Sequence, residues 1–221
     1  MKVTVGLSQM TPILGDVEAN LQLHLQQIEE AAAQGVELLI FPELSLTGYR
    51  LRDLAFTVAM EPTAENPIFR TLLEASKRMD LVVGFVEADK RQKFYIAAAY
   101  LSGGELVHLH RKVYLPTYGM FDEGRYFAWG DAIRAFDTRF GRVGILICED
   151  FWHVSTAHLL WLDGADILIL TSASPGHGLA TAQKIGSAKW VEHINQAYAS
   201  MFTNFVVHAN RTGFEDGVTF W

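Results

Sequence analysis

The sequence predicts an α/β protein in which helices cover β-sheets in layers. Apolar runs of strand length alternate with stretches whose apolar residues recur at helical spacing. Some strand-like runs also follow one another with no helix between them, which favours a layered sandwich. Half of the 221 residues are hydrophobic, enough for a sizeable core in one large domain.

The N-terminal region predicts a β-α-β unit. The segment KVTVGLSQM alternates as a strand does, and Asp16 suits the N-cap of a helix over roughly residues 17–33. Gly35 suits the end of that helix, because glycine readily adopts the left-handed conformation found there. The apolar run VELLIF, residues 36–41, is typical of a strand covered on both faces.

The rest of the chain continues the alternation. Asn66 and Pro67 suit the start of a helix over 66–79, and the Gly103–Gly104 pair indicates a hairpin turn. A long loop is expected over 113–131. The further predicted strands cover 81–88, 94–101, 105–111, 133–138, a run that ends at Cys148, 166–170 and 205–210, and the further helices lie near 154–162 and 187–201.

The organisation is that of a single domain over residues 1–221, with no linker or repeat. The final residues, EDGVTFW, read as a strand in progress, so we expect this domain to lack its C-terminal part. Neither a signal-peptide core nor an apolar run of about 20 residues occurs, and the one cysteine cannot form an intramolecular disulfide. These features predict a cytoplasmic protein that does not act on membranes.

Charge and motif content exclude several function classes. The formal net charge is -7, which disfavours nucleic acid and anionic membranes as partners. No phosphate-binding glycine loop is present, and the histidines lack the spacing of a zinc site. The sequence therefore predicts no metal and no organic cofactor.

Three predicted strands deliver a reactive side chain at their carboxyl ends, where functional residues of α/β sheets gather. Cys148 closes GRVGILIC, Glu43 follows VELLIF and Lys112 closes HLHRK. Alone, a cysteine is usually a small buried hydrophobe, and a glutamate or lysine is usually on the surface. Together, the three side chains indicate amide hydrolysis by an activated thiol.

A lysine beside the cysteine is expected to favour the thiolate, which is the nucleophilic form. An ammonium ~4 Å away contributes roughly 4 kcal/mol at an effective dielectric constant of ~20, or about three pKa units. We expect this attraction to compete with partial burial of Cys148. Glu43 is expected to titrate jointly with the thiol and to exchange protons with the leaving group and with water.

The motifs FPELSLTGY, HRKVYLPTYGMFDEGRYF and GILICEDFWH together resemble the nitrilase, or carbon-nitrogen hydrolase, superfamily over essentially the whole chain. The resemblance implies a four-layer α-β-β-α sandwich and a Glu-Lys-Cys triad at Glu43, Lys112 and Cys148. It also implies pairing of such sandwiches into a homodimer or higher homo-oligomer.

Within the superfamily, LPTYGMFDEGRYF and SASP are most similar to the glutaminase domain of glutamine-dependent NAD synthetase. That likeness implies that Glu123 is a second active-site glutamate. Ala180 stands where that family often has an arginine, which removes an expected partner for the α-carboxylate of glutamine. The residues expected to bind substrate are Tyr118, Glu149, Trp152 and Ser174, and further candidates for the pocket wall are Phe121, Tyr126 and Phe127.

The predicted function is hydrolysis of a non-peptide carbon-nitrogen bond in a small-molecule amide, through a cysteine thioester. The Cys-Glu-Asp sequence at 148–150 differs from the Cys-Trp-Glu setting common in true nitrilases and favours amides. A nitrilase or N-carbamoyl hydrolase with the same triad is an alternative. A non-catalytic interaction protein that retains the fold is an alternative of another class.

Overall fold

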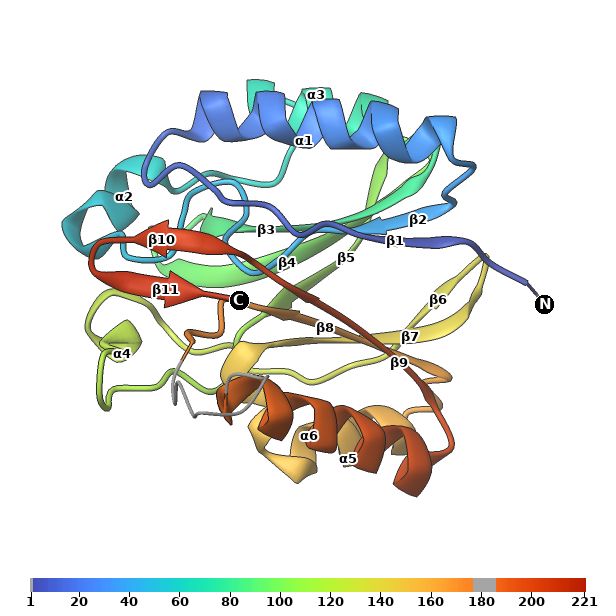
Figure 1. Ribbon diagram of the computed structural model, residues 1–221. Coiled ribbons are helices and arrows are strands. Elements are labelled where there is room, and N and C mark those ends of the chain that lie inside the picture. Colours follow the sequence, from blue (N-terminus) through green and yellow to red (C-terminus); the bar gives the residue numbers. More distant parts are fainter. Residues whose placement is uncertain (1, 177–185) are drawn as a thin grey trace.

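The computed structural model describes residues 2–176 and 186–221 and shows two β-sheets packed face to face between two layers of helices (Figure 1). One sheet has five strands and the other has four. Helices lie over the outer face of each sheet, so the order of layers is α-β-β-α. The predicted fold class is therefore confirmed.

In the first sheet, which has five strands, every strand except β4 runs in the same direction. The strand order is β1-β2-β3-β4-β5; β1, β2 and β3 are parallel, and β4 is antiparallel to β3 and β5. The carboxyl ends of β2 and β5 consequently lie at the same edge of the sheet. The strands are β1 (Val5–Leu7), β2 (Leu38–Ile40), β3 (Asp80–Ala88), β4 (Phe94–Ser102) and β5 (Glu105–Arg111).

The second sheet has the order β6-β7-β8-β9, with β7, β8 and β9 parallel and β6 antiparallel to β7. A separate antiparallel hairpin of β10 and β11 follows. The sequence EDGVTFW, expected to be an unfinished strand, contains the last residue of β10, the turn and β11. The strands are β6 (Phe136–Thr138), β7 (Gly141–Ile147), β8 (Ile167–Ser172), β9 (Phe205–Asn210), β10 (Gly213–Glu215) and β11 (Val218–Phe220).

The long helices begin where the sequence places their caps. The Asp16 carboxylate accepts the N–H of Ala19 at 3.0 Å, and the Asn66 side chain accepts that of Ile68 at 2.9 Å. Helices α1 and α3 cover the first sheet, and α5 and α6 cover the second (Figure 1). None of the described helices is long and apolar enough to cross a bilayer. Their bounds are α1 (Val17–Ala33), α3 (Pro67–Ala75), α5 (Val154–Leu162) and α6 (Gly186–Phe202).

Some boundaries differ from the predicted ones. Helix α3 ends at Ala75 rather than near 79, because the Ser76 hydroxyl bonds the Leu73 carbonyl at 2.7 Å and the chain turns toward β3. Strand β7 ends at Ile147, one residue before the cysteine. Four short helical turns were not predicted, because so few residues show no periodicity: η1 (Arg52–Leu54), α2 (Ala55–Val58), α4 (Glu123–Tyr126) and η2 (Cys148–Trp152).

Apolar side chains from both sheets form the layer between them. Ile40 and Val82 from the first sheet meet Ile145 and Ile169 from the second, and all four are buried. Burial of such side chains contributes roughly 1.5–3 kcal/mol each. Cys148 belongs to the same cluster, so the thiol lies at the end of the apolar layer rather than on the surface.

Gly84 lets the chain that follows β2 lie directly on β3. A Cβ atom at this position would be 2.4 Å from the Pro42 carbonyl oxygen and 2.6 Å from the Leu44 nitrogen. The Gly84 carbonyl also accepts the N–H of Leu46 at 3.0 Å. This contact places the segment that carries Glu43 against the sheet.

We predict that Gly84→Ala lowers the free energy of unfolding by about 1–3 kcal/mol, because rigid backbone atoms occupy the space of the new methyl group. The matched control is Gly6→Ala, whose Cβ would meet the side-chain methyls of Leu39 and Val36, which can shift. Urea denaturation measures both variants. Equal stability of the two would show that the close approach at Gly84 is not a constraint.

Candidate active site

The carboxyl ends of β2, β5 and β7 bring the three predicted catalytic residues to one place. The Lys112 ammonium lies 2.8 Å from Oε1 of Glu43 and 2.7 Å from Oε1 of Glu123. Cys148 lies beside them, close enough that their charges shift the pKa of its thiol. The relative exposures are 1% for Glu43, 0% for Lys112, 4% for Glu123 and 5% for Cys148.

The buried ammonium of Lys112 is stabilised by two carboxylates. Burial alone would lower the pKa of Lys112, but Glu123, Glu43 and Cys148 together raise that pKa well above its ordinary value. Lys112 therefore remains charged. Burial raises the pKa of Glu123 to about 7, with Lys112 opposing the shift and Glu43 adding to it.

The thiol of Cys148 is protonated at rest. Burial, followed by the charge of Glu43, raises its pKa well above the ordinary value, and the opposing effect of Lys112 is smaller. The expectation that a lysine would offset partial burial is wrong here, because burial is nearly complete and two glutamates share the lysine. Nucleophilic attack by this thiol requires a base that takes its proton.

Cys148 has an unusual backbone conformation, with a φ of 45° at the junction of β7 and η2. Non-glycine residues in this left-handed region cost of order 1–3 kcal/mol and persist where surrounding contacts impose them. One such contact comes from Asp150, whose Oδ2 accepts the N–H of Ile147 at 3.1 Å. Asp150 thus closes the turn that presents the thiol.

Asp150 also joins this turn to the segment that carries Lys112. Its Oδ1 accepts the N–H groups of Val113 and Tyr114, both at 2.9 Å. Its Oδ2 lies 2.9 Å from Nε2 of His110, on β5. A fully buried carboxylate with these partners fixes the position of the cysteine turn relative to the lysine.

The segment after β8 supplies a fourth strand end to the site. The N–H of Ala173 donates to Oε2 of Glu43 at 2.8 Å, so Glu43 is held from both sides. A backbone hydrogen bond from Ala173 also lowers the pKa of the Cys148 thiol, although burial outweighs it. The next residue, Ser174, donates its N–H to Oδ1 of Asn210 at 2.8 Å.

Cys148 lines a cavity of about 410 Å³ between η2, α6 and the loops around them. The predicted substrate-binding residues Tyr118, Glu149, Trp152 and Ser174 all line this cavity. The Tyr118 hydroxyl donates to Oε2 of Glu149 at 2.9 Å. Ala180 lies outside the described residues.

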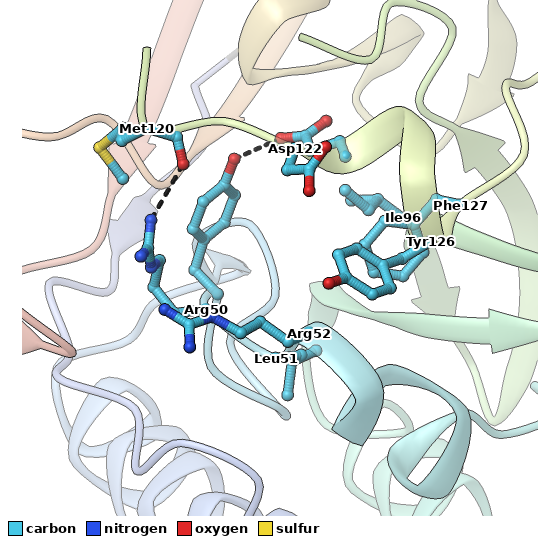
Figure 2. A pocket seen from close by; sticks show the side chains of 10 residues that line it. Arg50, Leu51, Arg52, Ile96, Met120, Asp122, Tyr126 and Phe127 are labelled. Carbon is cyan, nitrogen blue, oxygen red and sulfur yellow. Dashed lines mark hydrogen bonds between the residues drawn. The ribbon is translucent and has the colours of Figure 1, made fainter. Parts of the chain in front are cut away.

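A second cavity, of about 240 Å³, adjoins Glu123. Figure 2 shows Arg50 and Arg52 on one side of it and Tyr126 and Phe127 on the other. Tyr126 and Phe127, which were candidates for the wall of the substrate pocket, therefore line this second cavity and not the cavity of Cys148. Of the other aromatic candidates, Phe121 and Trp152 line the cavity of Cys148.

Two polar residues of the site were not predicted from the sequence. Asp150 positions the cysteine turn, and Tyr49 donates its hydroxyl hydrogen to Oε1 of Glu123. The sequence held a signal for Asp150, because an acid so close to a buried strand is costly to bury without partners. Tyr49 lies within FPELSLTGY, but its partner is 74 positions away in the chain.

The cation at the centre of the site is the Lys112 ammonium. Within residues 2–176 and 186–221, no group of three or more His, Cys, Asp or Glu side chains is placed to hold one. At the centre of the site, the Lys112 ammonium takes the position between carboxylates that a cation would occupy. A lysine there can polarise a carbonyl oxygen through its own charge.

Comparison with known proteins identifies the family. The carbon-nitrogen hydrolase family model matches residues 4–221. Glutamine-dependent NAD(+) synthetase of Thermotoga maritima is 33% identical over 208 residues, which cover 90% of this chain and 35% of that protein. A probable nitrilase of Schizosaccharomyces pombe is 32% identical over 180 residues, covering 78% of this chain and 64% of that protein.

The structure of glutamine-dependent NAD+ synthetase from Acinetobacter baumannii matches with a TM-score of 0.83 and 29% identity. The match covers 98% of this chain and 39% of that one. The chain thus spans little more than a third of the length of these synthetases. The family match over nearly every residue, together with the fold, shows that the chain belongs to the carbon-nitrogen hydrolase, or nitrilase, superfamily.

Proposed function

We propose that this chain hydrolyses the carbon-nitrogen bond of a small carboxamide through a thioester on Cys148. The observation that carries the proposal is the Lys112 ammonium held between Glu43 and Glu123, beside a thiol that faces a cavity. This arrangement supplies a nucleophile, a base and a fixed positive charge within one buried site.

In the first step, the sulfur of Cys148 bonds to the amide carbon while its proton passes to Glu43. The carbonyl π electrons move to the oxygen, and the resulting oxyanion is stabilised by Lys112 and by a backbone N–H beside Cys148. The high pKa of the resting thiol makes this transfer part of the attack rather than a prior ionisation. Glu123 keeps Lys112 oriented during the step.

In the second step, the carbon-nitrogen bond breaks and Glu43 gives its proton to the nitrogen, which leaves as ammonia or an amine. A water molecule then attacks the thioester, and Glu43 accepts one of its protons. When the carbon-sulfur bond breaks, the acid product leaves and Glu43 returns that proton to the sulfur. Glu43 thus acts as a base and then as an acid in each half of the reaction, and the scheme uses no cofactor.

The cavity beside Cys148 is large enough for a small amide. The cavity of about 410 Å³ is within the range for small-molecule pockets, and its wall includes both aromatic and polar side chains. The similarity to glutamine-dependent synthetases supports glutamine as one candidate substrate. Simple aliphatic amides are the other candidates, because Ala180 offers no charged partner to an α-carboxylate.

Hydrolysis of nitriles is a second candidate function. It is supported by the 32% identity to the probable nitrilase of Schizosaccharomyces pombe. Attack of the Cys148 sulfur on a nitrile carbon gives a thioimidate, which water converts to the same thioester with loss of ammonia. The cysteine chemistry is shared, so only the preferred substrate separates the two functions.

We predict that the protein releases ammonia from at least one amide in a panel of glutamine and simple aliphatic amides, and that Cys148→Ala abolishes this release. Loss of the sulfur removes the atom that forms the covalent bond. A coupled ammonia assay measures both proteins, with circular dichroism to confirm that the variant folds. Undiminished release by Cys148→Ala would eliminate the cysteine mechanism, whereas release from nitriles alone would select the second function.

We predict that Glu43→Gln lowers kcat by at least ~10²-fold while the protein remains folded, because a neutral amide cannot accept the thiol proton. The matched control is Glu87→Gln, at another buried glutamate, which pairs with Arg111 rather than with Lys112. This control is expected to leave kcat close to that of the wild type, because Glu87 bonds Arg111 and contacts neither Lys112 nor the thiol. Near-normal turnover by Glu43→Gln would remove Glu43 from the scheme.

A further inference from the structure

We propose that Glu215, on the C-terminal hairpin, is a positioning residue for the site: it holds Tyr49 in place, and Tyr49 holds Glu123 beside Lys112. The proposal rests on the proposed function for the role of Glu123. Glu215 itself touches none of the reacting groups. It acts through a continuous chain of contacts from the hairpin to the lysine.

The Glu215 carboxylate binds the backbone of the turn that carries Tyr49. Its Oε1 accepts the N–H of Tyr49 at 2.9 Å and that of Arg50 at 2.6 Å. Its Oε2 pairs with the guanidinium of Arg211, a fully buried side chain. Because both oxygens are engaged, the carboxylate is held firmly against the turn.

The turn and the hairpin are in close contact at Gly48, where φ is +79°. A Cβ atom there would lie 3.0 Å from Oε2 of Glu215 and 2.9 Å from Cα of Leu14. A side chain at this position would separate the carboxylate from the two N–H groups. The glycine therefore permits the backbone approach on which the contact depends.

The Tyr49 ring is buried in the apolar cluster between the sheets, with a cavity beside it. Phe220 of the hairpin and Phe121 make edge contacts with it, at centroid distances of 6.1 and 6.3 Å. Tyr49 also lines the second cavity, shown in Figure 2, where about 240 Å³ is unfilled by protein. The backbone contacts to Glu215 add to this packing in directing the Tyr49 hydroxyl at Glu123.

The Tyr49 hydroxyl and Lys112 bind the same oxygen, Oε1 of Glu123. The other oxygen, Oε2, is buried and has no hydrogen-bond partner within the described part of the chain. Glu123 is thus held by one ammonium and one hydroxyl. Loss of the hydroxyl would leave a buried carboxylate with Lys112 as its remaining side-chain partner among the described residues.

The groups that act on Glu123 predict the direction of a measurable shift. Burial and the charge of Glu43 raise the pKa of Glu123, whereas Lys112 and the hydrogen bond from Tyr49 lower it. The pKa of Tyr49 is itself raised well above its ordinary value by burial and by Glu123, so Tyr49 remains a donor. Weakening that bond should move the ionisation of Glu123 to higher pH.

The test measures the rate at which iodoacetamide alkylates Cys148, the one cysteine in the chain, as a function of pH. The thiol senses the charge of Glu123, so the rate should change where Glu123 ionises, near pH 7 in the wild type. We expect Glu215→Gln and Tyr49→Phe each to move this midpoint upward by about half to one pH unit, the value of one hydrogen bond.

A double variant identifies the route. If Glu215 acts through the Tyr49 hydroxyl, Tyr49→Phe with Glu215→Gln should shift the midpoint no further than Tyr49→Phe alone. The matched control is Asp216→Asn, on the next residue of the hairpin, which pairs with the side chains of Arg50 and Arg52. It should leave the midpoint unchanged.

Two results would overturn the proposal: an unchanged midpoint in Glu215→Gln despite a lower melting temperature, or additive shifts in the double variant. If Glu215→Gln does not fold, Glu215→Asp gives the same test, because it keeps a charge for Arg211 and withdraws the carboxylate from Tyr49. Alkylation of Cys148 needs no substrate, so the midpoint can be measured whether or not the protein hydrolyses amides. Failure of the proposed function would instead appear as absent amide and nitrile hydrolysis with the midpoint shifts intact.

Discussion

The buried charge of Lys112 is the constraint on which the rest of the site depends. Removing an ammonium from water costs several kcal/mol, and only well-placed opposite charges offset that cost. Glu43 and Glu123 supply these charges at 2.8 and 2.7 Å. Burial, and after it the charge of Glu43, raises the pKa of the Cys148 thiol more than Lys112 lowers it, so the thiol beside this cation is protonated at rest.

The sandwich suits this arrangement because strands from both sheets end at one edge. Glu43 and Lys112 come from the first sheet, and Cys148 and Ala173 come from the second. Contacts between the two sheets therefore also hold the proposed catalytic residues together. Asp150 joins the cysteine turn to the lysine segment, and the N–H of Ala173 joins the second sheet to Glu43. Separation of the sheets would disperse the site.

The helices, the strands and the positions of the three reactive residues could be predicted because each depends on residues close together in the sequence. The helix over 17–33 has a cap and a period, and Glu43, Lys112 and Cys148 each follow an apolar strand. Contacts between distant segments were not predictable in this way: Glu215 binds Tyr49 across 166 positions. The protonated state of the Cys148 thiol was also not predicted. The sequence showed neither how deeply the thiol is buried nor that Lys112 pairs with Glu123 as well as with Glu43.

Partition of the acyl group between water and hydroxylamine tests the covalent mechanism most directly. A primary amide and an ester with the same acyl group should form the same thioester on Cys148. A common thioester on Cys148 predicts one ratio of hydroxamate to acid from both compounds at a given hydroxylamine concentration. Ratios that differ between the amide and the ester would contradict a common thioester, and with it the role assigned to the cysteine.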